Sequence, residues 1–395
     1  MSDLPRTMTL VRTAVSASLD EVLAERRTAL VGVGGAADLL DAATTLLSGG
    51  KRMRAVLAAT GLALGVEDPA EREEVIAGPT AARLGAALEL YQASALAHDD
   101  VIDAAETRRG LPAAHRAMAS LHAGRGWRGS SSDFGSSAAI LLGDLLLSAA
   151  GREAGSALAA SGADPAARVA AREAFDAMTE EVAVGQFLDL RGEALPLPAP
   201  GEDATAAAAL MRDQALEVVL RKSARYSVAS PLLIGALLAG LSPASAEHAQ
   251  LTRFGEEVGI AFQLRDDVLG VVGDPATTGK PAGDDLREGK RTVLLATVWG
   301  RTDEAGRGLL REVLTHRGAP AARVSEAVEL LRSCGALEDH EREIAAHVAR
   351  AHKALAALGE PASRPGASDV GVVRPSRAAL DLLSDVAEAL TTRSA

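Results

Sequence analysis

Long stretches of this sequence carry apolar residues at every third or fourth position. The pattern is clearest over Thr80–Ala97, Ser136–Ala150, Ala166–Leu190 and Ala204–Leu220. Residues three and four apart share one face of an α-helix, and the chain is rich in Ala and Leu, with only 2% aromatic residues. The pattern therefore predicts an all-α protein, built as a large helical bundle.

The chain is long enough for two or three average domains, but its pattern predicts a single domain over residues 1–395. The Gly- and Ser-rich segment Ala123–Ser137 predicts a loop, and the Pro-containing segment Gly192–Asp203 predicts a break between helices. A last amphipathic helix is predicted at Ala378–Thr391. Several of the long helices are apolar on nearly every face, which is typical of a bundle centre or a subunit interface.

Charge and composition exclude several classes of protein. The net charge of −12 argues against a nucleic acid as partner, because binding to a phosphate backbone needs a basic surface. The N-terminal segment Met1–Arg27 lacks the apolar core of a signal peptide. The sequence also contains no wholly apolar run of about 18 residues, the length that a transmembrane helix needs, so no transmembrane segment is expected. Cys334 is the only cysteine, so an intramolecular disulfide is excluded and a cytoplasmic location is expected.

An acidic cluster, His98–Asp103, stands just before an arginine pair in Arg108–Gly110. In a helix Asp99 and Asp103 would share one face, and carboxylates so close raise one another's pKa unless a cation neutralises them. Such oxygen ligands suit Mg²⁺, which completes its coordination with substrate phosphate, and guanidinium groups bind phosphate oxygens in pairs. The stretch indicates a site for a metal-bound polyanion, although a lone cluster is equally consistent with a solvated helix end.

The same chemistry occurs again in Phe262–Asp267. Asp266 and Asp267 follow an apolar helical run, and Gln263 precedes them on the same helical face. The stretch Gly279–Thr292 comes next and mixes glycines with lysines, which predicts a basic loop beside a metal site. Two acidic clusters facing one cavity would hold several Mg²⁺ ions, with a diphosphate as their shared ligand.

Two further basic motifs lie outside the acidic clusters. In Gly49–Arg54, two glycines allow close approach of the backbone to a ligand and three basic side chains follow. The motif is not a Walker loop, because it lacks GxxxxGK[ST]. Arg221–Ser223 lies between predicted helical segments. Taken alone, either motif is consistent with solvated surface charge.

In this order along the chain, the motifs resemble those of the trans-isoprenyl diphosphate synthases, especially the bacterial geranylgeranyl diphosphate synthases. The resemblance covers roughly residues 10–300 and rests on Gly49–Arg54, Asp99–Asp103, Arg108–Gly110, Gly143–Asp144, Gly185–Gln186, Lys222–Ser223, Phe262–Asp267 and Gly279–Lys280. It implies an isoprenoid synthase-type helical bundle around a central active-site cavity, with additional C-terminal helices. It also implies a homodimer that condenses isopentenyl diphosphate with dimethylallyl, geranyl or farnesyl diphosphate and depends on Mg²⁺.

The resemblance further implies a role for each motif residue. Metal ligands would be Asp99, Asp103 and Asp266, with Asp100 and Asp267 orienting ligands or bound water. The residues implied at the allylic diphosphate, where the carbon–oxygen bond breaks, are Arg108, Lys222, Ser223, Gln263, Lys280 and Lys290. Those implied at isopentenyl diphosphate are Lys51, Arg54, Gln92 and Arg109.

Two positions depart from the family pattern. Gly270 stands where many relatives carry a third Asp of the second motif. The resemblance places the metal contact mainly on the first Asp of that motif, so the metal site is not expected to be lost, and whether Gly270 weakens the affinity for Mg²⁺ is left open. Gln92 stands where many carry His, but Gln also donates a hydrogen bond.

Product length in this family depends on the bulk of side chains shortly before the first acidic motif. Here Ala95 and Ser94 are small, and Tyr91 is the next large residue, one helical turn deeper. Tyr91 is either the floor of the product tunnel or an ordinary buried aromatic. The expected product is geranylgeranyl diphosphate or a somewhat longer chain.

Two other functions remain open on the motifs alone. A class I terpene cyclase shares metal-triggered ionisation but needs no second diphosphate site, so Lys51, Arg54 and Arg109 count against it. A non-catalytic subunit of a hetero-oligomeric prenyltransferase would be expected to lose acidic ligands, whereas both motifs here keep their leading Asp pair.

Overall fold

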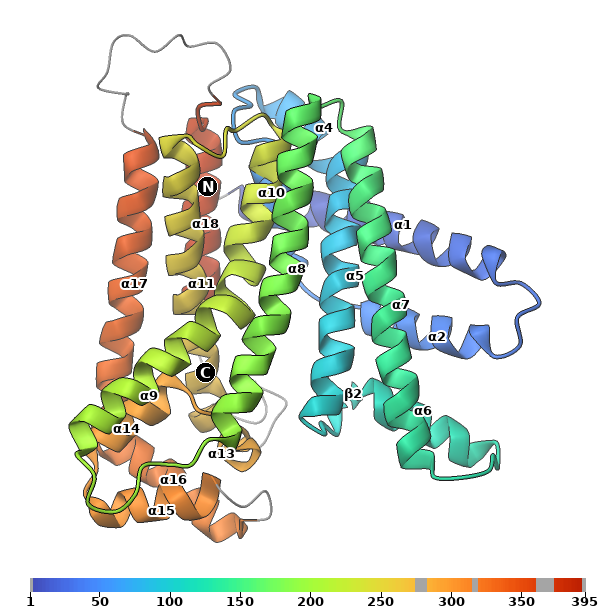
Figure 1. Ribbon diagram of the computed structural model, residues 1–395. Helices are drawn as coiled ribbons and strands as arrows, with labels where there is room; N and C mark the ends of the chain where they lie inside the picture. Colours follow the sequence, from blue (N-terminus) through green and yellow to red (C-terminus); the bar gives the residue numbers. More distant parts are fainter. Residues whose placement is uncertain (1–2, 274–282, 315–318, 360–372, 393–395) are drawn as a thin grey trace. The chain divides into compact units, whose positions relative to one another are not determined.

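The protein is almost entirely α-helical in the computed structural model, which describes residues 3–273, 283–314, 319–359 and 373–392 (Figure 1). Within these ranges the strands are limited to a short antiparallel hairpin of β1 Thr107–Arg108 and β2 Leu111–Pro112. The all-α prediction is therefore confirmed. The helices group into two compact units, one from Met1–Phe175, Pro231–Ser245 and Arg364–Leu382, the other from Asp176–Ser230, Ala246–Ser363 and Leu383–Ala395.

The first unit is built around one central helix, α5. Its helices are α1 Leu4–Ala29, α2 Ala36–Leu47, α3 Met53–Leu62, α4 Pro69–Ala77, α5 Pro79–Ile102, α6 Ala114–Gly124, α7 Ser131–Ala160, the start of α8 Pro165–Ala194, most of α10 Ser230–Leu238 and the start of α18 Arg377–Thr391. Helices α1, α3 and α7 all pack against α5, and Figure 1 shows α7 alongside α5. Alanine is the most frequent of the buried residues of α5, and its small side chain lets neighbouring backbones come close.

Two glycines bring α3 and α10 into backbone contact. A Cβ at Gly61 would lie 2.1 Å from the Leu232 carbonyl oxygen, and one at Gly235 would lie 2.0 Å from the Ala58 carbonyl oxygen. Neither position therefore has room for a side chain, and the crossing fixes α3, the helix in which the basic motif Gly49–Arg54 ends.

Helix α7 begins earlier than the sequence predicts. Ser130 is its N-cap, and the Ser130 hydroxyl accepts a hydrogen bond of 3.2 Å from the Asp133 backbone N–H. The predicted loop at Ala123–Ser137 is thus wrong for residues 131–137, and also for residues 123–124, which end α6. Among the described helices, α7 alone is long and apolar enough to cross a membrane, but core helices also meet that criterion and α7 packs against α5 and α6.

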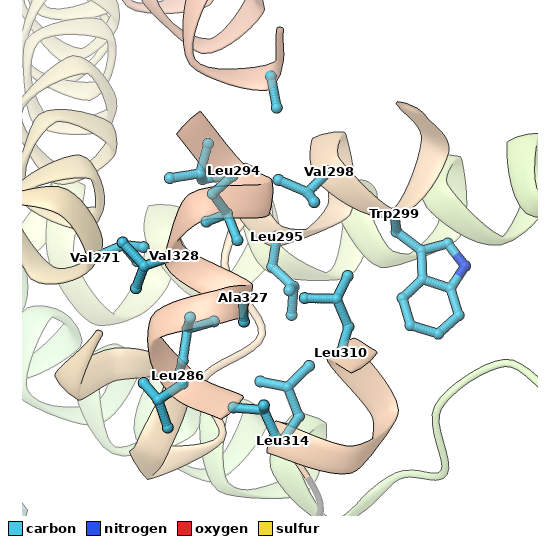
Figure 2. Packing of buried hydrophobic residues seen from close by; sticks show 14 of the residues in the cluster. Val271, Leu286, Leu294, Leu295, Val298, Trp299, Leu310, Leu314, Ala327 and Val328 are labelled. Carbon is cyan, nitrogen blue, oxygen red and sulfur yellow. The ribbon is translucent and has the colours of Figure 1, made fainter. Parts of the chain in front are cut away.

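The second unit surrounds α11. It contains the rest of α8 and α18 together with α9 Ala204–Val218, the π-helix η1 Val219–Ala229, α11 Ala246–Val272, α13 Asp284–Glu288, α14 Val293–Arg301, α15 Glu304–Leu314, α16 Ala321–Ser333 and α17 Ala336–Gly359. Helix α11 packs against η1 and α17. A hydrophobic cluster joins the end of α11 to α13, α14, α15 and α16, with Val271, Leu286 and Leu295 among its buried members (Figure 2).

The π-helix corrects another prediction. Arg221–Ser223 does not lie between helices but inside η1, which continues directly from α9. Glycines of α11 allow η1 to pack this closely, since a Cβ at Gly255 would lie 2.5 Å from the Ala229 Cα and one at Gly259 would lie 2.5 Å from the Ala224 carbonyl oxygen. Segments of π-helix are rare and occur frequently at functional sites.

We expect acid to weaken the packing of α17 on α11. Glu257 Oε2 on α11 lies 2.6 Å from His347 Nδ1 and accepts a 2.9 Å hydrogen bond from Arg350 Nε, both on α17. Burial raises the pKa of Glu257, but the bonds to His347 and Arg350 outweigh it and hold the pKa below its usual value of 4.5. A carboxyl with a lowered folded-state pKa contributes stability above its unfolded pKa, which is lost as pH falls through the folded pKa.

Thermal unfolding measured from about pH 7 to about pH 3 tests this contribution. The melting temperature of the wild type should fall more steeply with acid than that of Glu257→Gln, with Glu329→Gln, at an exposed position of α16, as the control. Identical slopes for the wild type and Glu257→Gln would contradict the assignment.

Candidate active site

The first acidic motif lies at the end of α5, in the first unit. Helix α5 ends at Ile102, and the Asp103 backbone N–H still donates to the Asp99 carbonyl oxygen at 2.8 Å, so the helical spacing continues through Asp103. The β1–β2 hairpin turns the chain so that Arg108 Nε donates to Asp100 Oδ1 at 2.8 Å and Arg108 Nη2 to Asp99 Oδ2 at 3.2 Å. Burial raises the pKa of Asp100, although its hydrogen bond with Arg108 opposes the shift. Arg108, predicted as a phosphate ligand, is thus paired with carboxylates.

The residues predicted to hold isopentenyl diphosphate lie in the same unit. Arg109 has a left-handed backbone (φ 54°), and its guanidinium group reaches Gly50, where a Cβ would lie 3.3 Å from Arg109 Nη1. Burial lowers the pKa of Arg109, and the positive charges of Arg52, Arg54 and Arg108 lower it further. Cations crowded in this way are stabilised by an anion, so the cluster fits a diphosphate.

An ion pair that the sequence did not predict supports this cluster. Arg52 Nη1 donates a 2.7 Å hydrogen bond to Glu89 Oε2, and both residues are buried, with exposed fractions of 7% and 4%. Arg52 also donates to the Leu47 carbonyl oxygen. The pair ties the basic motif to α5, on which Gln92 lies half-buried one turn further along. The only sequence signal was an acidic residue in an otherwise apolar helix.

His98, next to the first motif, packs on α7. Its Nε2 lies 3.1 Å from the Ile140 carbonyl oxygen and 3.6 Å from Asp144 Oδ1. A Cβ at Gly143 would come within 2.2 Å of the ring, so the glycine of the Gly143–Asp144 motif makes room for the histidine.

The three predicted chain-length residues lie on α5. Tyr91 is buried and meets Phe175 edge to face, with ring centroids 6.4 Å apart. Ser94 is buried and Ala95 is half-buried. Aromatic packing therefore restrains Tyr91 within the first unit, and its role in product length stays a prediction.

The second acidic motif lies near the end of α11, in the second unit. Gln263 Nε2 donates a 2.8 Å hydrogen bond to Asp267 Oδ1, as their spacing of four predicts. Asp267 is buried; burial raises its pKa to about 8, with Gln263 opposing the shift and the negative charges of Asp285 and Asp266 adding to it. Within the described residues Asp267 Oδ2 has no hydrogen-bond partner.

These carboxyl groups fit a divalent cation. A bound cation stabilises a buried carboxylate oxygen that has no hydrogen-bond donor. It also reduces the repulsion between neighbouring carboxylates. In the described part of the chain, however, no three His, Cys, Asp or Glu side chains lie close enough together to hold one ion. Any Mg²⁺ held by Asp99, Asp103 or Asp266 would need water or phosphate oxygens to complete its coordination, as is usual for this ion.

Lys222 is positioned by two features of α8. A Cβ at Gly185 would lie 2.5 Å from the Lys222 backbone nitrogen, so α8 and η1 touch through their backbones. Lys222 Nζ then donates a 2.6 Å hydrogen bond to Asp189 Oδ2. Neighbouring Arg221 is held in a similar way, by Glu181 at 3.0 Å. These acidic partners were not predicted from the sequence, although Asp189 follows the Gly185–Gln186 motif by one helical turn.

The remaining allylic-site predictions also fall in the second unit. Ser223 is half-buried in η1. Lys290 Nζ lies 2.6 Å from Glu288 Oε2 and 3.7 Å from Asp285 Oδ1. Lys280 lies outside the described residues. Each unit therefore brings one acidic motif together with its own set of basic residues.

Comparisons with known proteins agree with these motifs. The chain is 30% identical over 319 residues to a short chain isoprenyl diphosphate synthase of Methanothermobacter thermautotrophicus, covering 81% of this chain and 84% of that protein. It is 32% identical over 289 residues to a geranylgeranyl diphosphate synthase of Mycobacterium tuberculosis, covering 73% and 69%.

A solved structure is similar over nearly the whole chain. It is a geranylgeranyl pyrophosphate synthase from Corynebacterium glutamicum, complexed with isoprenyl diphosphate and magnesium, with a TM-score of 0.80, 31% identity, and coverage of 99% of this chain and 100% of that one. Residues 37–331 match the family model described as polyprenyl synthetase. The resemblance of the motifs is confirmed, and the chain belongs to the polyprenyl synthetase family of trans-prenyltransferases.

Proposed function

We propose that this protein is a Mg²⁺-dependent synthase that condenses isopentenyl diphosphate with dimethylallyl, geranyl or farnesyl diphosphate. The observation that carries the proposal is the crowding of cations around Arg109, where the positive charges of Arg52, Arg54 and Arg108 act on one guanidinium group, in a chain that also has two acidic motifs. The two acidic motifs suit a metal-bound diphosphate that ionises. The cations around Arg109 suit a second diphosphate that stays intact. A terpene cyclase has no use for the second site.

In the proposed reaction, Asp99, Asp103 and Asp266 would be the Mg²⁺ ligands, and the bound ion would supply positive charge that stabilises the leaving diphosphate. Lys222 and Lys290 orient that diphosphate while its carbon–oxygen bond breaks. The isopentenyl double bond then attacks the allylic cation, and the released diphosphate accepts the proton that is lost. Apolar walls must keep water away from the cation.

We further propose a product of geranylgeranyl length or somewhat longer, with Tyr91 as its limit. The small side chains at Ser94 and Ala95 support this length, because neither blocks a chain that has reached farnesyl size. Proteins similar to this chain include geranylgeranyl and geranylfarnesyl diphosphate synthases.

The enzyme is proposed to act as a cytoplasmic homodimer in which the whole chain forms one synthase domain. Helix α7 supports a dimer, because it exposes Ile140, Leu141 and Leu147 although it is a core helix of its unit. Sedimentation or light scattering would measure the subunit number.

Product analysis tests the proposed function directly. The purified protein is incubated with Mg²⁺, labelled isopentenyl diphosphate and each allylic diphosphate in turn, and product length is read by chromatography. All-trans products of geranylgeranyl length or longer are expected. Cyclic hydrocarbons formed without isopentenyl diphosphate would replace the proposal with the cyclase alternative.

The two diphosphate sites should separate in steady-state kinetics. Lys51→Ala, Arg54→Ala and Arg109→Ala are each expected to raise KM for isopentenyl diphosphate about tenfold or more, the scale of one charged hydrogen bond. Lys222→Ala and Lys280→Ala should instead act on the allylic substrate and on kcat. An unchanged KM for isopentenyl diphosphate in the Lys51 and Arg54 variants would place that substrate elsewhere.

A further inference from the structure

Gly270 lies on α11 one turn beyond Asp266, and the space beside it is filled by a carboxylate from another element. A Cβ at Gly270 would lie 2.0 Å from Asp285 Oδ2 and 2.6 Å from Asp285 Cγ. A side chain at position 270 would therefore require the Asp285 carboxylate to move. The glycine and the aspartate therefore form a matched pair, although 15 positions separate them in the sequence.

The position of Asp285 is set by packing on both sides of it. The Gly283 backbone N–H donates to the Val271 carbonyl oxygen at 3.0 Å, which joins the start of α13 to the end of α11. Leu286 is buried in the hydrophobic cluster with Val271 (Figure 2). Gly283 has a left-handed backbone (φ 77°), and a Cβ there would lie 2.8 Å from Val324 Cγ1. The short helix α13 is thus held against α11 with Asp285 pointing at Gly270.

Asp285 also belongs electrostatically to the second acidic motif. Its negative charge, with that of Asp266, acts on Asp267, whose buried Oδ2 has no hydrogen-bond partner among the described residues. On its other side, Asp285 Oδ1 lies 3.7 Å from Lys290 Nζ, and the Asp285 carbonyl oxygen accepts a 3.0 Å hydrogen bond from the Lys290 backbone N–H. Asp285 therefore lies between the acidic motif and a predicted diphosphate ligand.

We propose that Asp285 supplies, from α13, the third carboxylate of the second acidic motif, in the space that Gly270 leaves open on α11. This rests on the proposed function, since it concerns the same Mg²⁺–diphosphate complex. The described carboxylates are not close enough for three to hold one ion, so Asp285 acts as a positioning residue through water bound to Mg²⁺. Outer partners of this kind typically change metal affinity by 10–100-fold.

A swap of the carboxylate between the two positions tests the proposal. Asp285→Asn keeps the shape of the side chain and removes its charge, so it should weaken Mg²⁺ binding about tenfold. Gly270→Asp alone should lower the melting temperature, because two carboxyl groups compete for one space. In Gly270→Asp/Asp285→Ala the carboxylate comes from α11 instead, and Mg²⁺ affinity and melting temperature should both recover.

Affinity is measured by calorimetric titration of Mg²⁺ in the presence of inorganic pyrophosphate, with Glu329→Ala as an exposed control on α16 of the same unit. The proposal is overturned if Asp285→Asn binds Mg²⁺ as the wild type does, or if the double variant folds but does not recover affinity.

The Mg²⁺ titration tests the role of Asp285, and the product analysis tests the proposed function, so either proposal can fail without the other. If the wild type makes no prenyl diphosphate, the proposed function is wrong, but the Mg²⁺ titration can still be interpreted. An active wild type whose Mg²⁺ affinity is insensitive to position 285 removes only the role of Asp285.

Discussion

Asp99→Ala and Asp266→Ala should each lower kcat by a factor on the order of a hundred or more. Each variant removes a proposed ligand of the ion that stabilises charge developing on the leaving diphosphate, and such a contact contributes about 3 kcal/mol in the transition state. Because the interaction strengthens as the bond breaks, kcat should fall more than substrate affinity. Turnover with isopentenyl and farnesyl diphosphate over a range of Mg²⁺ concentrations is the measurement.

The matched control for these variants is Asp20→Ala, at an exposed position of α1. Circular dichroism and thermal unfolding would show that each variant keeps the helical fold. Near-normal turnover in either folded variant would show that the substituted aspartate is not a ligand of the catalytic metal. Activity that survives removal of Mg²⁺ by a chelator would count against the metal-dependent mechanism as a whole.

Glu89→Leu should destabilise the protein by about 3–5 kcal/mol, because it leaves the buried Arg52 guanidinium without its counter-charge. Arg52 has few other partners available, since its second bond is to the Leu47 carbonyl oxygen at the end of α2. The affected segment carries Lys51 and Arg54, so KM for isopentenyl diphosphate should rise as well. Denaturant unfolding followed by circular dichroism measures the loss of stability.

Two further variants separate the ion pair from general effects of substitution. Glu74→Leu changes an exposed glutamate of α4 in the same unit and should be close to neutral. Arg52→Met/Glu89→Leu replaces both charges with apolar groups and should recover most of the lost stability. If Glu89→Leu unfolds at the same denaturant concentration as the wild type, the charge of Arg52 must be neutralised by another group.

Local patterns predicted most of the fold. The apolar repeat at Thr80–Ala97 lies within α5 and that at Ser136–Ala150 within α7, because helical periodicity depends only on residues three and four apart. The start of α7 was misplaced, since a Ser- and Gly-rich segment favours a loop by composition, whereas Ser130 caps a helix that continues through it. Composition could not distinguish a capped helix start from a turn.

Pairings between distant residues were not predictable in this way. Arg108 looked free to bind phosphate, but the β1–β2 hairpin returns it to Asp99 and Asp100. Lys222 was identified without its partner Asp189, because that contact depends on how closely α8 and η1 approach at Gly185.

The sequence by itself determined the all-α class, the positions of both acidic motifs and the family, because these depend on short-range periodicity and on residue types in a fixed order. Tertiary structure alone decided that Arg52 is neutralised by Glu89 and that the gap at Gly270 is filled by Asp285. The physical reason is that the neutralisation of a charge, and the filling of a space, depend on residues that only packing brings close together. The sequence left open whether Gly270 weakens the second motif, and it could not predict that the space beside Gly270 is occupied by Asp285, which lies on a different helix.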